Sequence, residues 1–235
     1  LIGRHDVEVA YAVQRLNVEA RVAAGAKVVG RKIGLTSVAV QRQIGVDQPD
    51  FGVLLDDMAY AGGDTVPADA VLQPRAEAEI AFVLRHDLVE GDLDVEQVRC
   101  AIDYAVAAIE VCGSRVAGWD VSFGDTVADN ASSGAYVLGP HRRTLAEFDP
   151  IAAEMTMSID GEEVSTGSGA ACLGDPLNAV SWLARVARNL GDPLRAGQVI
   201  LSGALGPMCP IEPGNTVKAT VSGLGAVTFT LGGAA

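Results

Sequence analysis

Apolar residues recur along the chain at two spacings, one typical of helices and one typical of strands. Three segments have the helical spacing, and each begins at an aspartate that can cap a helix: 6–24, 94–106 and 175–190. Gly25 and Gly191 follow the first and the last of these segments, as glycine often does at a helix end. A shorter helix is predicted from Ser37 to Gly45.

The segment after Pro74 alternates as a half-buried strand does. One face would be apolar and would carry Ala76, Ala78, Ile80, Phe82 and Leu84. The other face would carry Glu77 and Glu79, so two carboxylates point the same way. Two like charges about 4 Å apart repel by ~4 kcal/mol at an effective dielectric constant near ~20. A strand tolerates this pair only if its end is wet, if one carboxyl holds a proton, or if a cation lies between them.

Turn residues and β-branched runs indicate further strands. A strand is predicted over 27–34, a loop or turn over 47–52, and a two-residue hairpin turn at Asp160-Gly161. The run 107–112 suits a helix end and a strand equally well. The Val-, Ile-, Thr- and Gly-rich tail from Gln198 predicts closing strands.

No repeat, low-complexity tract or linker divides the 235 residues. We therefore expect an α+β fold, a single mixed and β-rich catalytic domain with a few packed helices. It would comprise an N-terminal helical segment of about 1–26 and a β-rich core of about 27–235. No uncharged apolar run reaches the ~18 residues that a membrane span needs.

Composition narrows the choice of partner and compartment. The formal net charge of −13 argues against nucleic acid or an anionic membrane surface as partner. The same charge repels an anionic substrate, so capture would need a local positive centre such as a bound metal ion. The four cysteines form no Cys-x-x-Cys pair and lie far from the three histidines, which disfavours a zinc or iron–sulfur site. Reduced thiols and a first helix unlike a signal peptide predict a cytoplasmic protein.

Glu110 is a third acid of interest, because it lies in an almost wholly apolar run. An ionised carboxylate is costly there unless it meets a partner. With Glu77 and Glu79 it forms a set that suits a hard divalent ion, Mg²⁺ or Mn²⁺, completed by water or substrate. By spacing alone, two surface glutamates on an edge strand and one salt-bridged glutamate are the simpler explanation.

Several local motifs occur together and shift that balance. They are G-R-K-I-G-L-T at 30–36, Q-P-D-F-G at 48–52, Glu77-x-Glu79 followed by Glu110, D-T-V-A-D-N-A-S-S-G at 125–134, and L-S-G-A-L-G-P-M at 201–208. In this combination the sequence resembles the fumarylacetoacetate hydrolase superfamily over almost its whole length. Within the superfamily it resembles the branch of 2-hydroxypenta-2,4-dienoate (2-oxopent-4-enoate) hydratases, which also contains 4-oxalocrotonate decarboxylases.

The resemblance implies that Glu77, Glu79 and Glu110 hold Mg²⁺ or Mn²⁺. It also implies the β-rich fold of the family's C-terminal domain and assembly as a homo-oligomer. The family's conserved Lys and Asp match Lys32 and Asp50 here. Lys32 is one of only three lysines among 17 basic residues, and an ammonium can exchange a proton whereas a guanidinium effectively cannot.

We expect Lys32 to act as an acid, and Asp50 as a base or a water-positioning group. A solvated lysine and a structural turn aspartate are the alternatives. Ser133 and Ser202 are flanked by glycine and are candidates to bind a substrate carboxylate, although small residues in tight packing explain them equally well. Trp119, like the other tryptophan, is expected in the core.

The expected reaction is the metal-dependent addition of water to 2-hydroxypenta-2,4-dienoate, which gives 4-hydroxy-2-oxopentanoate in the meta-cleavage catabolism of aromatic compounds. A 4-oxalocrotonate-type decarboxylase is the nearest alternative, but it would need an extra cation for a second carboxylate. A C–C bond hydrolase of a 2,4-diketo acid would want a His–acid pair, which the motifs lack. A non-catalytic partner subunit is the remaining alternative. Association with a pathway aldolase or decarboxylase is left open, as is the chain length of the dienoate.

Overall fold

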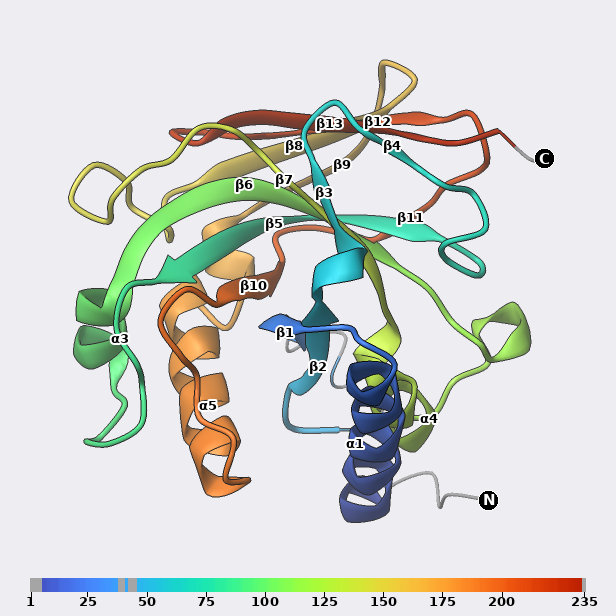
Figure 1. The fold of residues 1–235 in the computed structure, drawn as a ribbon. Helices are drawn as coiled ribbons and strands as arrows, with labels where there is room; N and C mark the ends of the chain where they lie inside the picture. The colour runs from blue at the N-terminus through green and yellow to red at the C-terminus, as the bar shows by residue number, and fades with distance from the viewer. Residues whose placement is uncertain (1–5, 38–40, 42–45, 234–235) are drawn as a thin grey trace.

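The computed structural model describes residues 6–37, 41 and 46–233, and it has an α+β fold rich in strands (Figure 1). The larger sheet has eight strands in the order β2-β1-β10-β5-β6-β7-β3, with β11 beside β5, and a second sheet has the order β4-β13-β12-β8-β9. The strands are β1 Val28–Gly34, β2 Asp50–Leu55, β3 Ala59–Ala61, β4 Thr65–Val66, β5 Arg75–Leu84, β6 Ile102–Cys112, β7 Ser133–Leu138, β8 Glu154–Ile159, β9 Glu162–Ser168, β10 Val199–Ala204, β11 Cys209–Pro210, β12 Thr216–Val221 and β13 Gly225–Leu231. The α-helices are α1 Val7–Ala23, α3 Val95–Ala101, α4 Phe123–Ala128 and α5 Pro176–Asn189.

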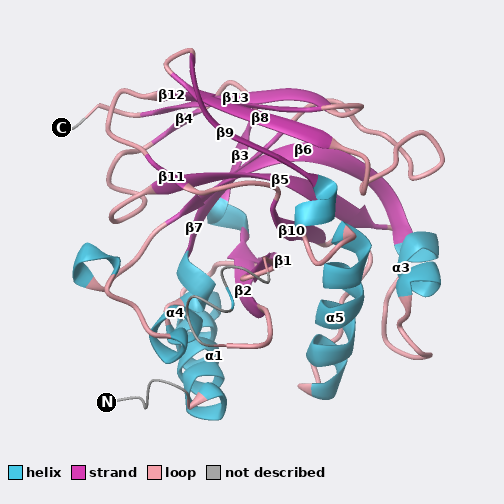
Figure 2. Cartoon of the chain, turned by 180° about the vertical axis from the view of Figure 1, so that it is seen from behind, coloured by secondary structure: helices cyan, strands magenta, loops and turns pink. Residues whose placement is uncertain are grey.

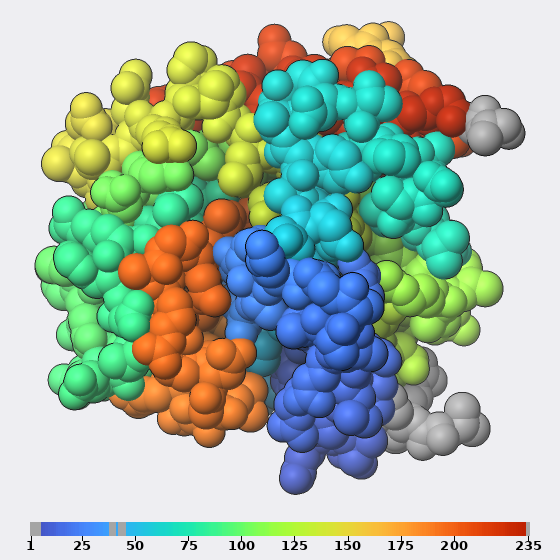
Figure 3. All heavy atoms as spheres, in the orientation of Figure 1, coloured from blue at the N-terminus to red at the C-terminus, as the bar shows by residue number. Residues whose placement is uncertain are grey.

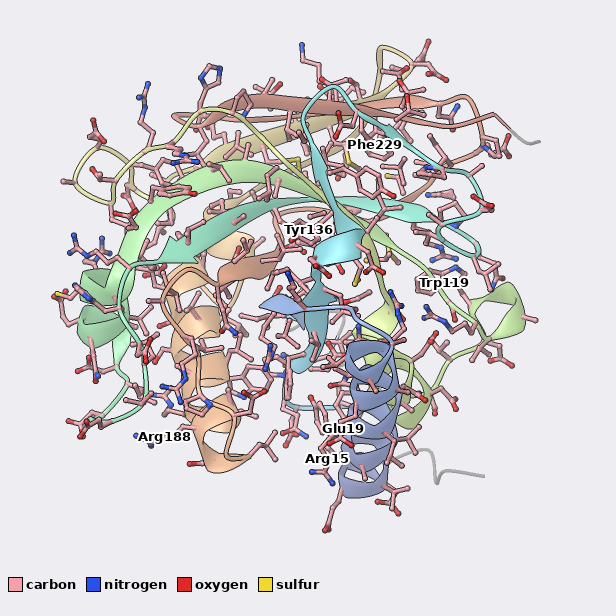
Figure 4. The ribbon with its side chains drawn as sticks, viewed as in Figure 1. Arg15, Glu19, Trp119, Tyr136, Arg188 and Phe229 are labelled. Carbon is pink, nitrogen blue, oxygen red and sulfur yellow. The ribbon has the colours of Figure 1, made fainter. Side chains whose placement is uncertain are left out.

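The long antiparallel pair of β5 and β6 forms an arch that separates two sides of the molecule (Figure 1). The second sheet covers the convex side, and the apolar residues between the sheets, among them Phe229 of β13, belong to one core cluster (Figure 4). Helices α1 and α4 lie below this arch in the view of Figure 1, as the reverse view in Figure 2 also shows, while α5 packs its buried face into the same core cluster as the second sheet. The concave side is thus enclosed by helices and loops.

The N-terminal segment and the segment 176–200 meet on this side (blue and orange in Figure 3). They meet because β1 pairs in parallel with β10, with Lys32 opposite Leu201. None of the helices within the described residues is long and apolar enough to cross a bilayer.

Local sequence explains most element boundaries. The side chains of Asp6, Asp94 and Asp175 accept hydrogen bonds from backbone N–H groups in the first turns of α1, α3 and α5, as the capping pattern predicts. The apolar face predicted for β5 is also confirmed, because all five of its residues are buried. The hairpin turn at Asp160-Gly161 joins β8 to β9, with positive φ at both residues.

Three predicted segments have other outcomes. The loop over 47–52 is wrong in its second half, since β2 begins at Asp50 and pairs with β1. The run 107–112 is strand and belongs to β6, and α3 ends at Ala101 where that strand begins. The helix predicted from Ser37 to Gly45 lies largely outside the described residues.

Candidate active site

The register of β5 and β6 brings the three predicted acids together. Glu77 lies directly opposite Glu110 across the ladder, and Glu79 is the next residue on the same face of β5. Glu79 and Glu110 are both fully buried, whereas Glu77 is half-buried and reaches a cavity. Residues that are 33 positions apart in the sequence thus form one cluster of three carboxyl groups.

The carboxyl oxygens of this cluster lack ordinary partners. Glu79 Oε2 accepts a hydrogen bond of 2.7 Å from the backbone N–H of Gly203, in the irregular part of the β10–β5 ladder. Within the described part of the chain, Glu79 Oε1 and both carboxyl oxygens of Glu110 are buried without a hydrogen bond. Leaving one such buried group unsatisfied costs about 1–3 kcal/mol, and more when the group is charged. The cluster therefore offers oxygen donors whose hydrogen-bonding capacity is unsatisfied, as expected for a cation site.

Burial and mutual repulsion also perturb the acids. Burial, followed by the charges of Glu110 and Glu77, raises the pKa of Glu79 well above its ordinary value. Burial raises the pKa of Glu110 to about 7, although the ammonium of Lys32 lowers it in part. Without a metal ion, the fold therefore favours the protonated form of Glu79.

A buried lysine lies beside these acids. Lys32 of β1 is 3% exposed, and its Nζ lies 3.3 Å from Glu110 Oε2 and donates a hydrogen bond of 3.0 Å to the carbonyl of Ala131. Burial on its own would lower the pKa of Lys32, but the surrounding acids, Glu110 first, raise it well above its ordinary value. Lys32 is therefore a charged ammonium, and the solvated lysine at a strand edge is wrong.

Asp50 is the fifth member of the group. It is 2% exposed, it lies opposite Gly34 of β1, and its Oδ1 has no hydrogen-bond partner among the described residues. An added Cβ on Gly34 would lie only 2.2 Å from Asp50 Oδ1, so only glycine leaves room for this carboxyl. Burial raises the pKa of Asp50 to about 6, against the opposing charge of Lys32. A carboxyl with this pKa and a free oxygen can accept a proton near neutral pH.

Two sets of three residues could bind a metal ion here, Glu77 and Glu110 with either Cys112 or Glu79. The ligand atoms of Glu77, Glu110 and Cys112 lie within 4.8 Å of one another. However, burial raises the pKa of the Cys112 thiol well above its ordinary value, and its Sγ donates to Glu77 Oε2 at 3.7 Å. A protonated thiol is a poor ligand for a hard ion, whereas Glu79 presents a buried oxygen with no partner. The chemistry of the donors therefore favours Glu79 as the third ligand.

A cavity of about 1100 Å³ opens onto this group. Lys32, Asp50 and Glu77 contribute to its wall, while Glu79 and Glu110 lie behind it. The wall also includes the less polar residues Phe123, Leu205, Gly206, Pro207 and Met208. The lining thus combines charged and apolar side chains, which fits a small amphipathic acid.

Arg75 and Trp119 also line the cavity, and the sequence analysis missed both. The guanidinium of Arg75 lies 4.4 Å from the centre of the Trp119 ring, a cation–π contact. Trp119 is on the edge of the molecule in Figure 4 and is half-buried, so its prediction as a core residue is wrong. Arg75 lies two residues before Glu77 on β5, and this spacing was the signal that could have placed it on the same face.

Ser133 and Ser202 are buried, and neither hydroxyl has a hydrogen-bond partner within the described residues. Both lie behind the cavity wall instead of on it. Contact between these hydroxyls and a substrate stays a prediction.

Known proteins are similar to this chain in both sequence and fold. The model of the fumarylacetoacetate (FAA) hydrolase C-terminal family matches residues 7–231. The chain is 55% identical to the TodF product hydratase of Pseudomonas putida, over 97% of this chain and 85% of the relative. It is 53% identical to a 2-keto-4-pentenoate hydratase of Paraburkholderia xenovorans, over 94% of this chain and 82% of the relative.

Among solved structures, 4-oxalocrotonate decarboxylase from Pseudomonas putida G7, complexed with magnesium and adipate, superposes with a TM-score of 0.92. It is 35% identical, and the match covers 96% of this chain and 86% of that one. The match to the family model over nearly the whole chain and the identity above 50% agree with the cluster of acids, lysine and aspartate. On these grounds, the chain belongs to the fumarylacetoacetate hydrolase family.

Proposed function

We propose that this protein is a hydratase that adds water to 2-hydroxypenta-2,4-dienoate and forms 4-hydroxy-2-oxopentanoate. The observation that carries the proposal is the group of buried carboxyl oxygens, several without a hydrogen bond, beside Lys32 and Asp50 at the cavity. The relatives named 2-keto-4-pentenoate hydratase support the same reaction, since that keto acid is a tautomer of the dienoate.

Glu77, Glu79 and Glu110 would hold a divalent cation, Mg²⁺ or Mn²⁺. The residues fit such an ion because they offer hard oxygen donors, and because Glu79 Oε1 and Glu110 Oε1 have no hydrogen-bond partner among the described residues. A cation held there supplies a positive centre for the carboxylate and the C2 oxygen of the substrate, in a protein of net charge −13. The magnesium in the related decarboxylase supports this choice.

Lys32 and Asp50 would move the protons. In the first step, Asp50 accepts the proton of the 2-hydroxyl group and Lys32 donates a proton to C5, which yields the 2-oxo-3-enoate. Before the second step, exchange with cavity water removes the proton from Asp50 and reprotonates Lys32, so both groups are restored. Water then adds at C4, Asp50 takes the proton that this water loses, and Lys32 protonates C3. Each step removes one proton from the reactants and returns one, so the net change is the addition of one water molecule.

The arrangement of the chain supports these roles. The ammonium of Lys32 is fixed by the Ala131 carbonyl and by Glu110, so its remaining donor capacity can serve the cavity. The free Oδ1 of Asp50 supplies a proton acceptor with a pKa of about 6. Positioned acids and bases of this kind typically contribute ~10²–10⁴-fold each to the rate.

The test is the loss of the dienol ultraviolet absorbance, with Mg²⁺, with Mn²⁺ and after treatment with a chelator. Turnover in ¹⁸O-labelled water should place the label at C4 of the product. We expect K32A and D50N each to lose ~10²–10⁴-fold in kcat, while K218A, at an exposed lysine of β12, keeps wild-type turnover. No loss of absorbance with either ion would refute the function, and near-normal turnover in both site variants would refute the roles.

A decarboxylase of the 4-oxalocrotonate type is a second candidate, because one observation favours it. The sequence suggested no cation for a second carboxylate, but Arg75 places a guanidinium on the cavity wall. The same assay separates the two functions. Release of CO₂ from a dicarboxylic dienoate would indicate the decarboxylase, whereas loss of the dienol absorbance without CO₂ indicates the hydratase.

A further inference from the structure

The strand that carries Asp50 lies at the edge of its sheet, and side chains instead of another strand complete its hydrogen bonding. β2 is the first strand in the sheet order, with β1 on its inner side. On its outer side, the N–H of Phe51 donates to Tyr11 Oη at 3.2 Å and its carbonyl accepts from Gln14 Nε2 at 2.9 Å. An unpaired edge exposes such groups to solvent or to another chain, so these contacts close the edge.

Asn130 supplies the next two bonds along the same edge. Its Oδ1 accepts from the N–H of Val53 at 2.8 Å, and its Nδ2 donates to the carbonyl of Val53 at 2.9 Å. One side chain thus reproduces the paired bonds that a neighbouring strand would make. We call this pair of Asn130–Val53 hydrogen bonds the clamp. It holds β2 three residues after Asp50, on the side where β2 has no neighbouring strand among the described residues.

The backbone around Asn130 is strained, and it also reaches Lys32. Asn130, Ala131 and Ser132 have φ values of 57°, 51° and 58°, a left-handed turn built without glycine. Each such residue costs about 1–2 kcal/mol, except that asparagine tolerates this conformation better than most. The turn directs the Ala131 carbonyl to Lys32 Nζ at 3.0 Å. Strain of this kind persists only where the surrounding structure holds it.

The surroundings of the turn fit that requirement. Ser132 Oγ lies 3.0 Å from Thr126 Oγ1, and the Ser132 carbonyl accepts from the N–H of Gly113 at 2.8 Å. An added Cβ on Gly52, the residue opposite Lys32, would lie 2.2 Å from the Asn130 carbonyl oxygen. The close approach of β2 to the turn therefore depends on glycine at 52 and on the clamp of Asn130.

We propose that Asn130 is a positioning residue, which fixes Asp50 through β2 and Lys32 through the Ala131 carbonyl. One side chain thereby sets the separation of the two groups that handle protons. The role rests on the proposed function, since Lys32 and Asp50 matter as a pair only if both act in one reaction. The three acids stand on β5 and β6, whereas both hydrogen bonds of the Asn130 side chain go to Val53 of β2.

Two variants separate the clamp from the strain. N130G removes the amide but suits the left-handed backbone, whereas N130A removes the amide and keeps the strain. N215A is the matched control, because Asn215 also uses both amide atoms, accepting from Glu212 N–H and donating to Asp160 Oδ2 at 2.7 Å each, but it lies in the loop before β12.

Both Asn130 variants should lose about tenfold to a hundredfold in kcat, since small displacements of reacting groups have effects of this size. Their KM, and their Mg²⁺ affinity measured by calorimetry, should both stay within about threefold of wild type. The reason is that the groups that bind the substrate and the ion in the ground state are unchanged. N215A should keep the wild-type kcat. Wild-type kcat in N130G would overturn the proposal, as would a parallel loss of Mg²⁺ affinity.

Hydrogen–deuterium exchange gives a result that is independent of turnover. The peptide 50–55 should exchange faster in N130G and N130A than in wild type or N215A, because the Val53 amide loses its acceptor. Unchanged exchange would overturn the clamp. If the wild-type protein shows no hydratase activity, the proposed function fails on its own evidence while the exchange result still decides the contact.

Discussion

Replacing Glu79 with glutamine should stabilise the metal-free protein and abolish its stabilisation by metal. Glu79 Oε2 can be replaced by the amide oxygen, which keeps the bond from the Gly203 N–H. The amide nitrogen then takes the place of Oε1, which has no partner among the described residues. A neutral amide in this orientation resembles the protonated carboxyl that the metal-free fold requires, and it can donate toward Glu110.

The magnitude follows from linkage between protonation and folding. The pKa of Glu79 in the fold lies well above its ordinary value, so the folded wild-type protein binds a proton that the unfolded chain has released. Its stability therefore falls as pH rises from the unfolded pKa toward the folded pKa, by up to ~1.4 kcal/mol per pH unit. E79Q lacks this loss, so its advantage in chelator should grow as the pH rises from 6 to 8.

Saturating Mg²⁺ should remove this advantage. Binding at about 100 times the dissociation constant stabilises a fold by ~2.7 kcal/mol, and E79Q should lose most of this gain. The assay is urea unfolding at pH 6, 7 and 8, with chelator or with Mg²⁺. D103N on the neighbouring strand β6 serves as a control because Asp103 is exposed. If E79Q is less stable than wild type in chelator at every pH, the repulsion inferred from the buried acids is wrong.

Three further predictions follow from the same site. Since the raised pKa of Glu79 favours its protonated form in the metal-free fold, Mg²⁺ binding near pH 7 should release about one proton. The Mg²⁺ affinity should therefore fall by up to ~10-fold for each unit fall in pH. Calorimetry in two buffers would detect the released proton, and binding without proton release would contradict this prediction. R75M should lower kcat/KM for a dicarboxylic dienoate at least ~10-fold more than for the monocarboxylic substrate, because the second carboxylate loses a charged partner. Equal losses of kcat/KM for both substrates would exclude Arg75 as that partner. G203A should weaken Mg²⁺ binding, because a Cβ there would lie 2.4 Å from Thr36 Oγ1 and displace the N–H that fixes Glu79. G197A has a similar positive φ and nothing within 4 Å, so it controls for backbone strain, and an equal effect of both substitutions on Mg²⁺ affinity would contradict the reasoning.

The sequence is enough to predict on which face of the strand each acid lies, because the face is a local property of the strand. Alternation in β5 is enough to place Glu77 and Glu79 on one face, and the surrounding apolar run is enough to mark Glu110 as buried. The register that sets Glu77 opposite Glu110 is a property of the finished sheet, which no local pattern encodes. Arg75 was missed although the same alternation places it beside Glu77, because an arginine near a strand end reads as a solvated residue.

The start of β2 shows why the remainder needs tertiary structure. Pro49-Asp50-Phe51-Gly52 has the composition of a turn, and only its pairing with β1 and its closure by Tyr11, Gln14 and Asn130 make it a strand. These three side chains come from α1 and from the turn after α4, so their bonds form only after the helices have packed. Asp50 thus owes its position to groups from 39 residues before it to 80 residues after it. A residue placed in this way should respond to substitutions that never touch the substrate, and for this reason the Asn130 variants test the site more directly than a further change in the acids would.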